Sequence, residues 1–135
     1  MPQTIQQQRA AFAHQVVVEV TGQDMRARAK FRSLARSLPM MILANGLGQT
    51  LAMLKADEAT AMLSAITGWL ELRKHPCSFD ALMQADQESY FIAQSEALKV
   101  AEWIKIIATA LIPQPQRGDR QDSVQTEDIA QPPAP

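Results

Sequence analysis

The chain has 135 residues, of which 47% are hydrophobic and 20% charged, which is typical of one domain large enough to bury a core. Its single cysteine, Cys77, excludes an internal disulfide and fits a reducing cytoplasm. Aromatic residues make up only 5%, and Ala, Leu, Gln and Met are frequent, which favours helices over strands. The first residues show no charged segment followed by an apolar run, so we expect no signal peptide.

The net charge of −1 is unevenly distributed along the chain. Residues 1–55 contain seven cationic and two anionic side chains, a net charge of +5. Residues 56–112 contain four cationic and eight anionic side chains, a net charge of −4, and residues 113–135 carry −2. This asymmetry allows one face of a small domain to meet nucleic acid and another to meet a basic protein surface.

The first part of the chain predicts two amphipathic helices, over residues 4–20 and 25–37. Thr4 and Gln7 have the spacing of a capping box, and Asp24 is suited to be the N-cap of the second helix. Arg9 falls outside the predicted apolar face of the first helix.

The second helix predicts a cationic outer surface. Its apolar face comprises Ala27, Phe31, Leu34 and Leu38. Five cations lie away from that face, and this helix contains no carboxylate after its predicted N-cap, Asp24. These residues, named the basic face below, are Arg26, Arg28, Lys30, Arg32 and Arg36.

A third helix is predicted over residues 39–55, inside the longest uncharged stretch of the chain. Pro39 should end the second helix and open the third, because the residue before a proline avoids the α region. The apolar row of this helix predicts a central, buried position, and it comprises Met40, Leu43, Leu47, Leu51 and Leu54. A membrane span is the disfavoured alternative, because the stretch also contains a proline, two glycines and several polar residues.

Asn45, Gly46 and Gly48 interrupt this apolar segment. Glycine costs about 1 kcal/mol relative to alanine in a helix interior. We therefore expect Gly46 and Gly48 to allow the close approach of another helix or a partner. Together with Pro39, these residues are predicted to have a structural role.

Three further helices are predicted over residues 58–74, 79–85 and 87–112, with Asp57, Ser78 and Asp86 as N-caps. The whole pattern predicts an all-α fold, a compact bundle of five to six helices in one domain over residues 1–112. Residues 113–135 are rich in Pro and Gln and contain few large apolar residues, so they are predicted to be a disordered tail.

No metal site, cofactor site or catalytic group is predicted. His75 and Cys77 lack the spacing of metal ligands, and they are interpreted as a helix-end cation and a loop thiol. A Cys77 nucleophile with His14 or His75 as its base is the minor alternative. Asn45–Thr50 has neither the spacing nor the lysine of a phosphate-binding loop.

The basic face is the strongest functional signal, and its plain alternative is a solvated surface. Its cations suit the phosphate backbone of a nucleic acid, read without base specificity. No aromatic residue lies between the cations on the exposed side, so base stacking is not indicated. A helix-turn-helix is disfavoured, because its recognition helix would be the uncharged one.

Several segments together carry a resemblance to a known family. They are Arg-Ala-Lys-Phe-Arg-Ser-Leu-Ala-Arg-Ser-Leu-Pro at 28–39, Ile42, Asn-Gly-Leu-Gly-Gln-Thr-Leu-Ala at 45–52, Lys55, Trp69-Leu70, and Tyr90 at the start of a long last helix. Over roughly residues 5–112, the chain resembles the small helical subunit of type III-B CRISPR RNA-guided effector complexes, the Cmr complex. Met53 departs from the pattern, since an aromatic residue is usual there.

The resemblance implies a helical bundle without enzymatic activity that acts in antiviral RNA targeting. Copies of such a subunit stack into a minor filament, beside the crRNA-binding backbone subunits and against the large polymerase-like subunit. The basic face, together with Lys55, then holds phosphates of the crRNA–target RNA duplex, mainly those of the target strand. The rival hypothesis is a helical adaptor or regulator that binds only protein, and an enzyme acting through Cys77 or His75 is a distant third.

Overall fold

A computed structural model describes residues 2–114 of the chain. This part of the chain folds into α-helices without any strand, which confirms the predicted all-α class. The helices are α1 (Ile5–Thr21), α2 (Met25–Asn45), α3 (Leu47–Ala56), α4 (Thr60–Leu72), α5 (Phe79–Gln84) and α6 (Gln87–Leu111). Apart from Pro113 and Gln114, the segment predicted to be a disordered tail lies outside the described residues.

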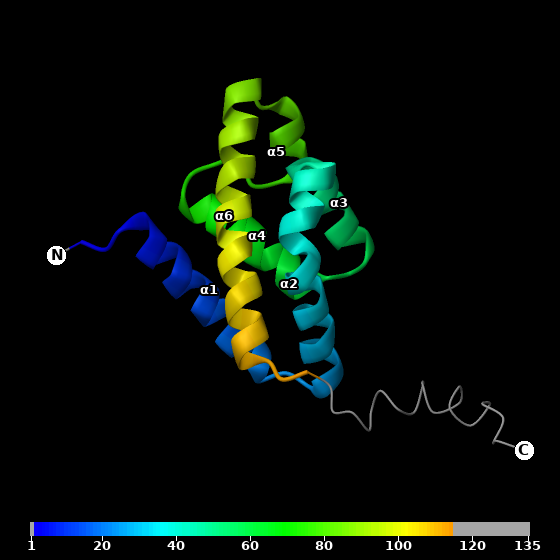
Figure 1. The fold of residues 1–135 in the computed structure, drawn as a ribbon. Helices are drawn as coiled ribbons and strands as arrows, with labels where there is room; N and C mark the ends of the chain where they lie inside the picture. Colours follow the sequence, from blue (N-terminus) through cyan, green and yellow to red (C-terminus); the bar gives the residue numbers. More distant parts are fainter. Residues whose placement is uncertain (1, 115–135) are drawn as a thin grey trace, which may run out of the picture.

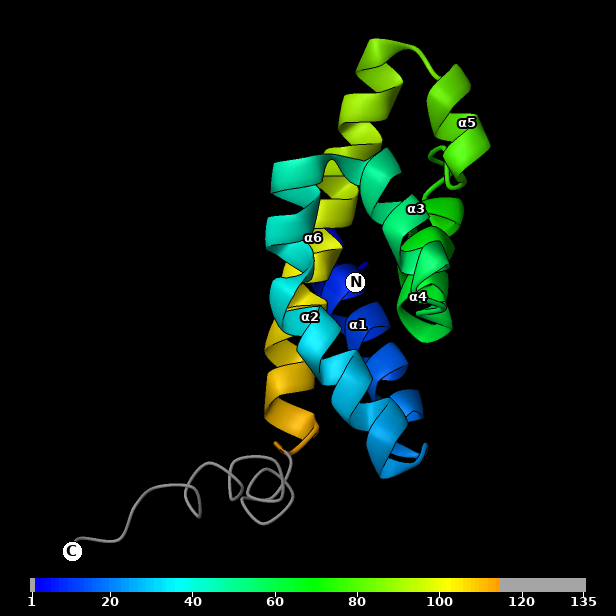
Figure 2. The same ribbon diagram turned by 90° about the vertical axis from the view of Figure 1, so that its right-hand side faces the viewer.

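The long helices α2 and α6 run antiparallel and form the axis of the bundle (Figure 1). Helices α1, α3, α4 and α5 lie on one side of the α2–α6 pair (Figure 2), where α1 contacts both α6 and α4. As a result, the end of α1, the start of α2 and the end of α6 meet at one end of the bundle (Figure 1).

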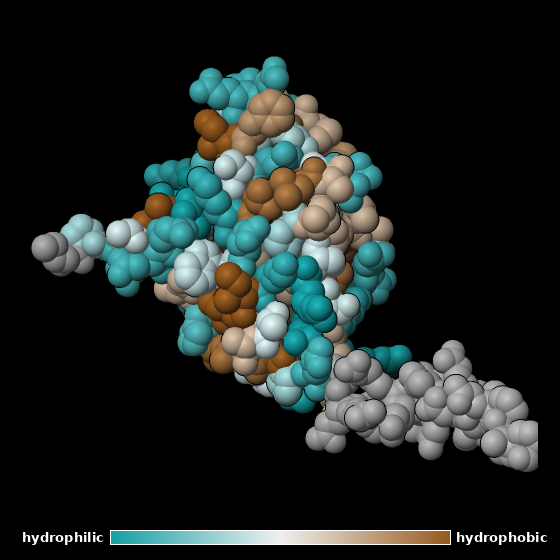
Figure 3. All heavy atoms as spheres, viewed as in Figure 1, coloured by the Kyte–Doolittle hydropathy of each residue, from teal (hydrophilic) through white to brown (hydrophobic). Residues whose placement is uncertain are grey.

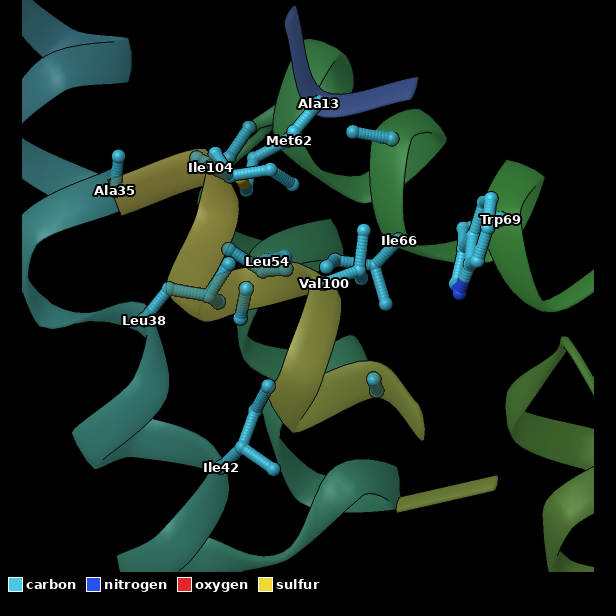
Figure 4. Close-up of a cluster of buried hydrophobic side chains, with 14 of the residues drawn as sticks. Ala13, Ala35, Leu38, Ile42, Leu54, Met62, Ile66, Trp69, Val100 and Ile104 are labelled. Carbon is cyan, nitrogen blue, oxygen red and sulfur yellow. The ribbon is translucent and has the colours of Figure 1, made fainter. Parts of the chain in front are cut away.

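The core lies between α6 and the helices around it. Helix α6 contributes mainly small buried side chains, including Ala93, Ala97 and Ala101, which allow the neighbouring helices to pack closely. Larger side chains from α2 and α4 fill the space around Val100 and Ile104 of α6 (Figure 4). These labelled side chains include Leu38, Ile42, Met62, Ile66 and Trp69.

The predicted boundary at Pro39 is wrong, because Pro39 lies buried inside α2, which continues to Asn45. A proline inside a helix costs about 3 kcal/mol. The burial of Leu38 and Ile42 on either side of Pro39 offsets this cost. Because this segment continues α2, Met40 and Leu43 turn outward and are 66% and 61% exposed, whereas a buried position was predicted.

The helix break lies instead at Gly46, with φ 81° and ψ 161°, a region that is essentially restricted to glycine. Gly46 ends α2 and begins α3. It also divides Met25–Ala56, which by length and composition alone could cross a membrane. In the most apolar 18 residues of that stretch, 44% are buried inside the bundle, where they form part of the core.

Most of the predicted helix starts are confirmed. Thr4 forms a capping box with Gln7, and the side chains of Asp24, Ser78 and Asp86 accept the expected backbone hydrogen bonds. Asp57 is the exception, since it ends α3 rather than starting α4. Glu58 follows with φ 56°, and α4 begins only at Thr60.

Helix α3 has no side-chain cap of its own and receives one from α6. The Leu47 amide donates to Gln94 Oε1 at 2.8 Å, and the Gly48 amide donates to the Tyr90 hydroxyl at 2.9 Å. A Cβ atom at Gly48 would lie 2.8 Å from Met83 Cε and 3.2 Å from the Tyr90 hydroxyl. The missing side chain at Gly48 therefore leaves room for the Tyr90 contact that ties α3 to α6.

A buried ion pair, which the sequence did not predict, joins three helices. Arg9 of α1 donates to both carboxylate oxygens of Glu96 on α6, at 2.8 and 2.9 Å, and the two side chains are only 7% and 12% exposed. Trp69 of α4 donates its indole N–H to Glu96 Oε1 at 2.9 Å. Hydrogen bonds from Arg9 and Trp69 lower the pKa of Glu96, and the bond to Glu96 raises the pKa of Arg9.

Replacing Gly48 with leucine should lower the free energy of unfolding by about 1–3 kcal/mol, because the larger side chain overpacks against Met83 and Tyr90. Urea denaturation measures this change. Gly68→Ala is the matched control, since its Cβ meets only Phe12 Cζ at 3.8 Å. It should be neutral or stabilise the protein by up to about 1 kcal/mol. A Gly48→Leu protein as stable as the parent would show that this site is not tightly packed.

Glu96→Gln should destabilise the protein by about 3 kcal/mol at pH 7, because Arg9 is left buried without its counter-charge. The lowered folded-state pKa means that the contribution of Glu96 is complete above its ordinary value of 4.5 and is lost as the pH falls through the folded-state pKa. The stability difference between parent and variant should therefore shrink below about pH 4.5 in urea titrations. A difference that stays constant down to pH 3 would contradict this role.

Candidate nucleic-acid interface

The basic face lies on the N-terminal half of α2, beside the end of the bundle where α1 and α6 finish (Figure 1). Arg26, Lys30 and Arg36 are exposed, whereas Arg28 and Arg32 are half-buried. Phe31, Ala35 and Leu38 hold the opposite side of α2 in the core. Because the helix is anchored on that side, the cations are confined to its outer arc and its flanks.

Three of these cations contact the C-terminal ends of three other helices. Arg28 Nη1 donates to the Thr21 carbonyl of α1 at 3.3 Å. Lys30 Nζ donates to the Asp57 carbonyl at the end of α3 at 3.0 Å, and Arg32 Nε donates to the Ile112 carbonyl at the end of α6 at 2.9 Å. Terminal carbonyls carry partial negative charge, so each contact stabilises its helix end, typically by 0.3–1 kcal/mol.

The basic face keeps its positive charge despite these contacts. Over residues 2–114, the single ion pair within 4 Å is the one between Arg9 and Glu96, so no carboxylate neutralises a cation of α2. Among residues 2–114, Arg32 engages only its Nε–H, which leaves its two terminal amino groups as further donors. The α2 cations are therefore positioned by backbone carbonyls and remain able to bind a polyanion.

Lys55 is on α3 rather than on α2. It is exposed near the end of α3, and it lines an open groove of about 790 Å³ between α3, α4 and α5. Glu71, Cys77 and Asp80 line the same groove. The structure therefore groups five of the six predicted RNA-binding residues on one helix and places Lys55 on another, in a groove that two carboxylates also line.

The remaining candidate residues have structural surroundings. Asn45 is half-buried at the end of α2, with its amide 3.8 Å from Met53 Sδ, the residue that departs from the family pattern. Within residues 2–114, no group of three or more His, Cys, Asp or Glu side chains is placed to hold a metal ion.

The comparison with known families agrees with this arrangement. A family model described as CRISPR-associated protein (Cas_Cmr5) matches residues 5–111, from the first residue of α1 to the last residue of α6. The chain belongs to the Cas_Cmr5 family. It is therefore a small subunit of the type III-B Cmr complex and associates with other Cmr subunits, and the resemblance noted in the sequence is confirmed.

Sequence reasoning missed the carbonyl contacts of this Cas_Cmr5 chain. In the sequence, nothing distinguishes these three cations from solvated surface cations. Tertiary packing brings the three helix ends to Arg28, Lys30 and Arg32, and no local pattern shows it. The one usable signal was indirect: neither α1 nor α6 has a basic residue in its own last turn. Their terminal carbonyls thus lack a local cation.

The carbonyl contacts predict unequal effects on stability along the basic face. Arg32→Ala should lower the free energy of unfolding by about 1 kcal/mol, because the Ile112 carbonyl loses a charged donor. Arg36→Ala, four residues further along the same helix, should change it by less than about 0.5 kcal/mol. Thermal or urea unfolding of both variants tests this difference, and equal effects would show that the contact with Ile112 contributes nothing.

Proposed function

We propose that this Cas_Cmr5 subunit is a non-catalytic part of the Cmr ribonucleoprotein and uses the basic face to hold the crRNA–target RNA duplex. The observation that carries the proposal is the group of five α2 cations that no carboxylate neutralises among the described residues. Such a group favours phosphate binding that does not depend on base sequence.

The dimensions of the basic face fit a short run of phosphates. From Arg26 to Arg36, α2 rises about 15 Å. Arg26 and Arg36 lie outermost, and the carbonyl contacts hold Arg28 and Arg32 between them in fixed positions. Arginine side chains that are already ordered lose less conformational entropy on binding. The basic face therefore supports affinity for the RNA backbone, mainly through the target strand.

The remaining surface suits contacts with protein. Outside the basic face, exposed apolar side chains include Met40, Leu43, Phe91 and Ile106. Apolar groups alternate with polar ones on the side of the molecule shown in Figure 3. In the proposed function, such surfaces meet stacked copies of this subunit, the crRNA-binding backbone subunits and the large polymerase-like subunit. The subunit acts in the cytoplasm, without a cofactor and without contact with a membrane.

The double variant Arg26→Ala/Arg36→Ala should weaken target RNA binding by the reconstituted Cmr complex while preserving the fold, because neither residue contacts a helix end. Each lost phosphate contact should also reduce the slope of log affinity against log salt by roughly one unit. Filter binding or fluorescence anisotropy over a salt series measures both quantities.

Lys74→Ala/Lys99→Ala removes the same charge from exposed positions, in the turn after α4 and on α6, and is the matched control. It should leave the affinity and the salt slope close to those of the parent. If both double variants behave like the parent, the basic face does not hold RNA, and a purely protein-binding adaptor becomes the better explanation.

A further inference from the structure

The chain leaves the bundle at the basic face. Ile112 is buried at the end of α6, and its carbonyl accepts the hydrogen bond from Arg32 of α2. Pro113 and Gln114 follow on the surface. Any residue that comes after Gln114 is therefore tethered within reach of Arg28 and Arg32.

The sequence beyond this exit point has the opposite charge. Residues 115–135 carry a net charge of −2, and their two cations, Arg117 and Arg120, both precede Asp122. Residues 122–129, Asp-Ser-Val-Gln-Thr-Glu-Asp-Ile, contain three carboxylates, two large apolar residues and no cation. This segment is named the acidic segment below, and it is the most anionic part of the chain outside the bundle.

We propose that the acidic segment binds the basic face when the subunit is free of RNA, and that RNA displaces it. The proposal rests on the proposed function, since it adds an intramolecular competitor for the same cations. The ten residues that follow Ile112, up to and including Asp122, can span up to about 33 Å, whereas Arg26 and Arg36 are about 15 Å apart along α2.

The surroundings of the basic face suit both kinds of side chain in this segment. Asp122, Glu127 and Asp128 can pair with arginines that no described carboxylate occupies. Met25 at the start of α2 and Leu111 at the end of α6 are exposed beside these cations, and they offer apolar contacts to Val124 and Ile129. The acidic segment and the surroundings of the basic face are therefore complementary in charge, and both offer apolar side chains for contact.

The contact is expected to be weak but sufficient to compete. Tethering through a short linker gives an effective concentration in the millimolar range. If the segment, with its three carboxylates, binds the basic face with a dissociation constant about 2- to 9-fold below that concentration, it reduces the apparent affinity for RNA by roughly 3- to 10-fold. Since both interactions are electrostatic, this competition should fade as salt is added.

The test compares the full-length parent with the triple variant Asp122→Asn/Glu127→Gln/Asp128→Asn. The variant should bind a single-stranded RNA 20-mer about 3- to 10-fold more tightly at low salt, and the two affinities should converge near 0.5 M salt. The control Glu71→Gln/Asp80→Asn/Glu88→Gln changes the net charge equally on α4, α5 and the start of α6, away from the basic face. An equal gain in this control would overturn the proposal.

NMR without RNA tests the contact separately from the proposed function. The triple variant should shift the side-chain Nε–Hε signals of Arg28 and Arg32 relative to the full-length parent, and the control should not. Unchanged signals would overturn the proposal even if the parent binds RNA. If the signals shift but no form of the protein binds RNA, then the acidic segment does contact the basic face, and the proposed RNA-binding function is wrong.

Discussion

The buried pair between Arg9 and Glu96 is the contact on which the arrangement of the helices depends. Burying either charge alone would cost several kcal/mol, so the fold tolerates Glu96 only when Arg9 and Trp69 both donate to it. That requirement fixes the positions of α1 and α4 on α6. In the same N-terminal half of α6, Tyr90 and Gln94 fix α3 in a similar way, through hydrogen bonds from the amides of Gly48 and Leu47. Helix α6 thus organises its neighbours through polar contacts as well as its small apolar face.

Once α1, α3 and α6 are placed, their C-terminal ends come to lie along the N-terminal half of α2. The carbonyls of Thr21, Asp57 and Ile112 then need donors, and Arg28, Lys30 and Arg32 supply them. The same cations are therefore part of the fold and of the proposed RNA interface. Partial negative charge on the carbonyls offsets some of the positive potential, but the ordering of the side chains lowers the entropic cost of binding.

Much of this structure was predictable from local signals. Capping residues such as Thr4, Asp24, Ser78 and Asp86 identified helix starts, because their hydrogen bonds depend only on nearby backbone. Pro39 misled the prediction because burial on both sides of it outweighed its local preference, which is a tertiary effect. Arg9 and Glu96 are 87 residues apart, so no local pattern connected them. The position of the cations on α2 followed from helical periodicity, whereas their carbonyl partners required the fold.

The two roles of the basic face make different demands on each cation. Arg32 uses its Nε–H for the Ile112 carbonyl, and its two terminal amino groups can bind a phosphate without breaking that bond. Lys30 has one ammonium group, already directed at the Asp57 carbonyl, so a phosphate must share it or compete for it. Arginine is therefore the better residue wherever a helix end and an RNA strand are held together. Arg26 and Arg36 contact no helix end, and a polyanion can bind them without any loss of contacts within the bundle.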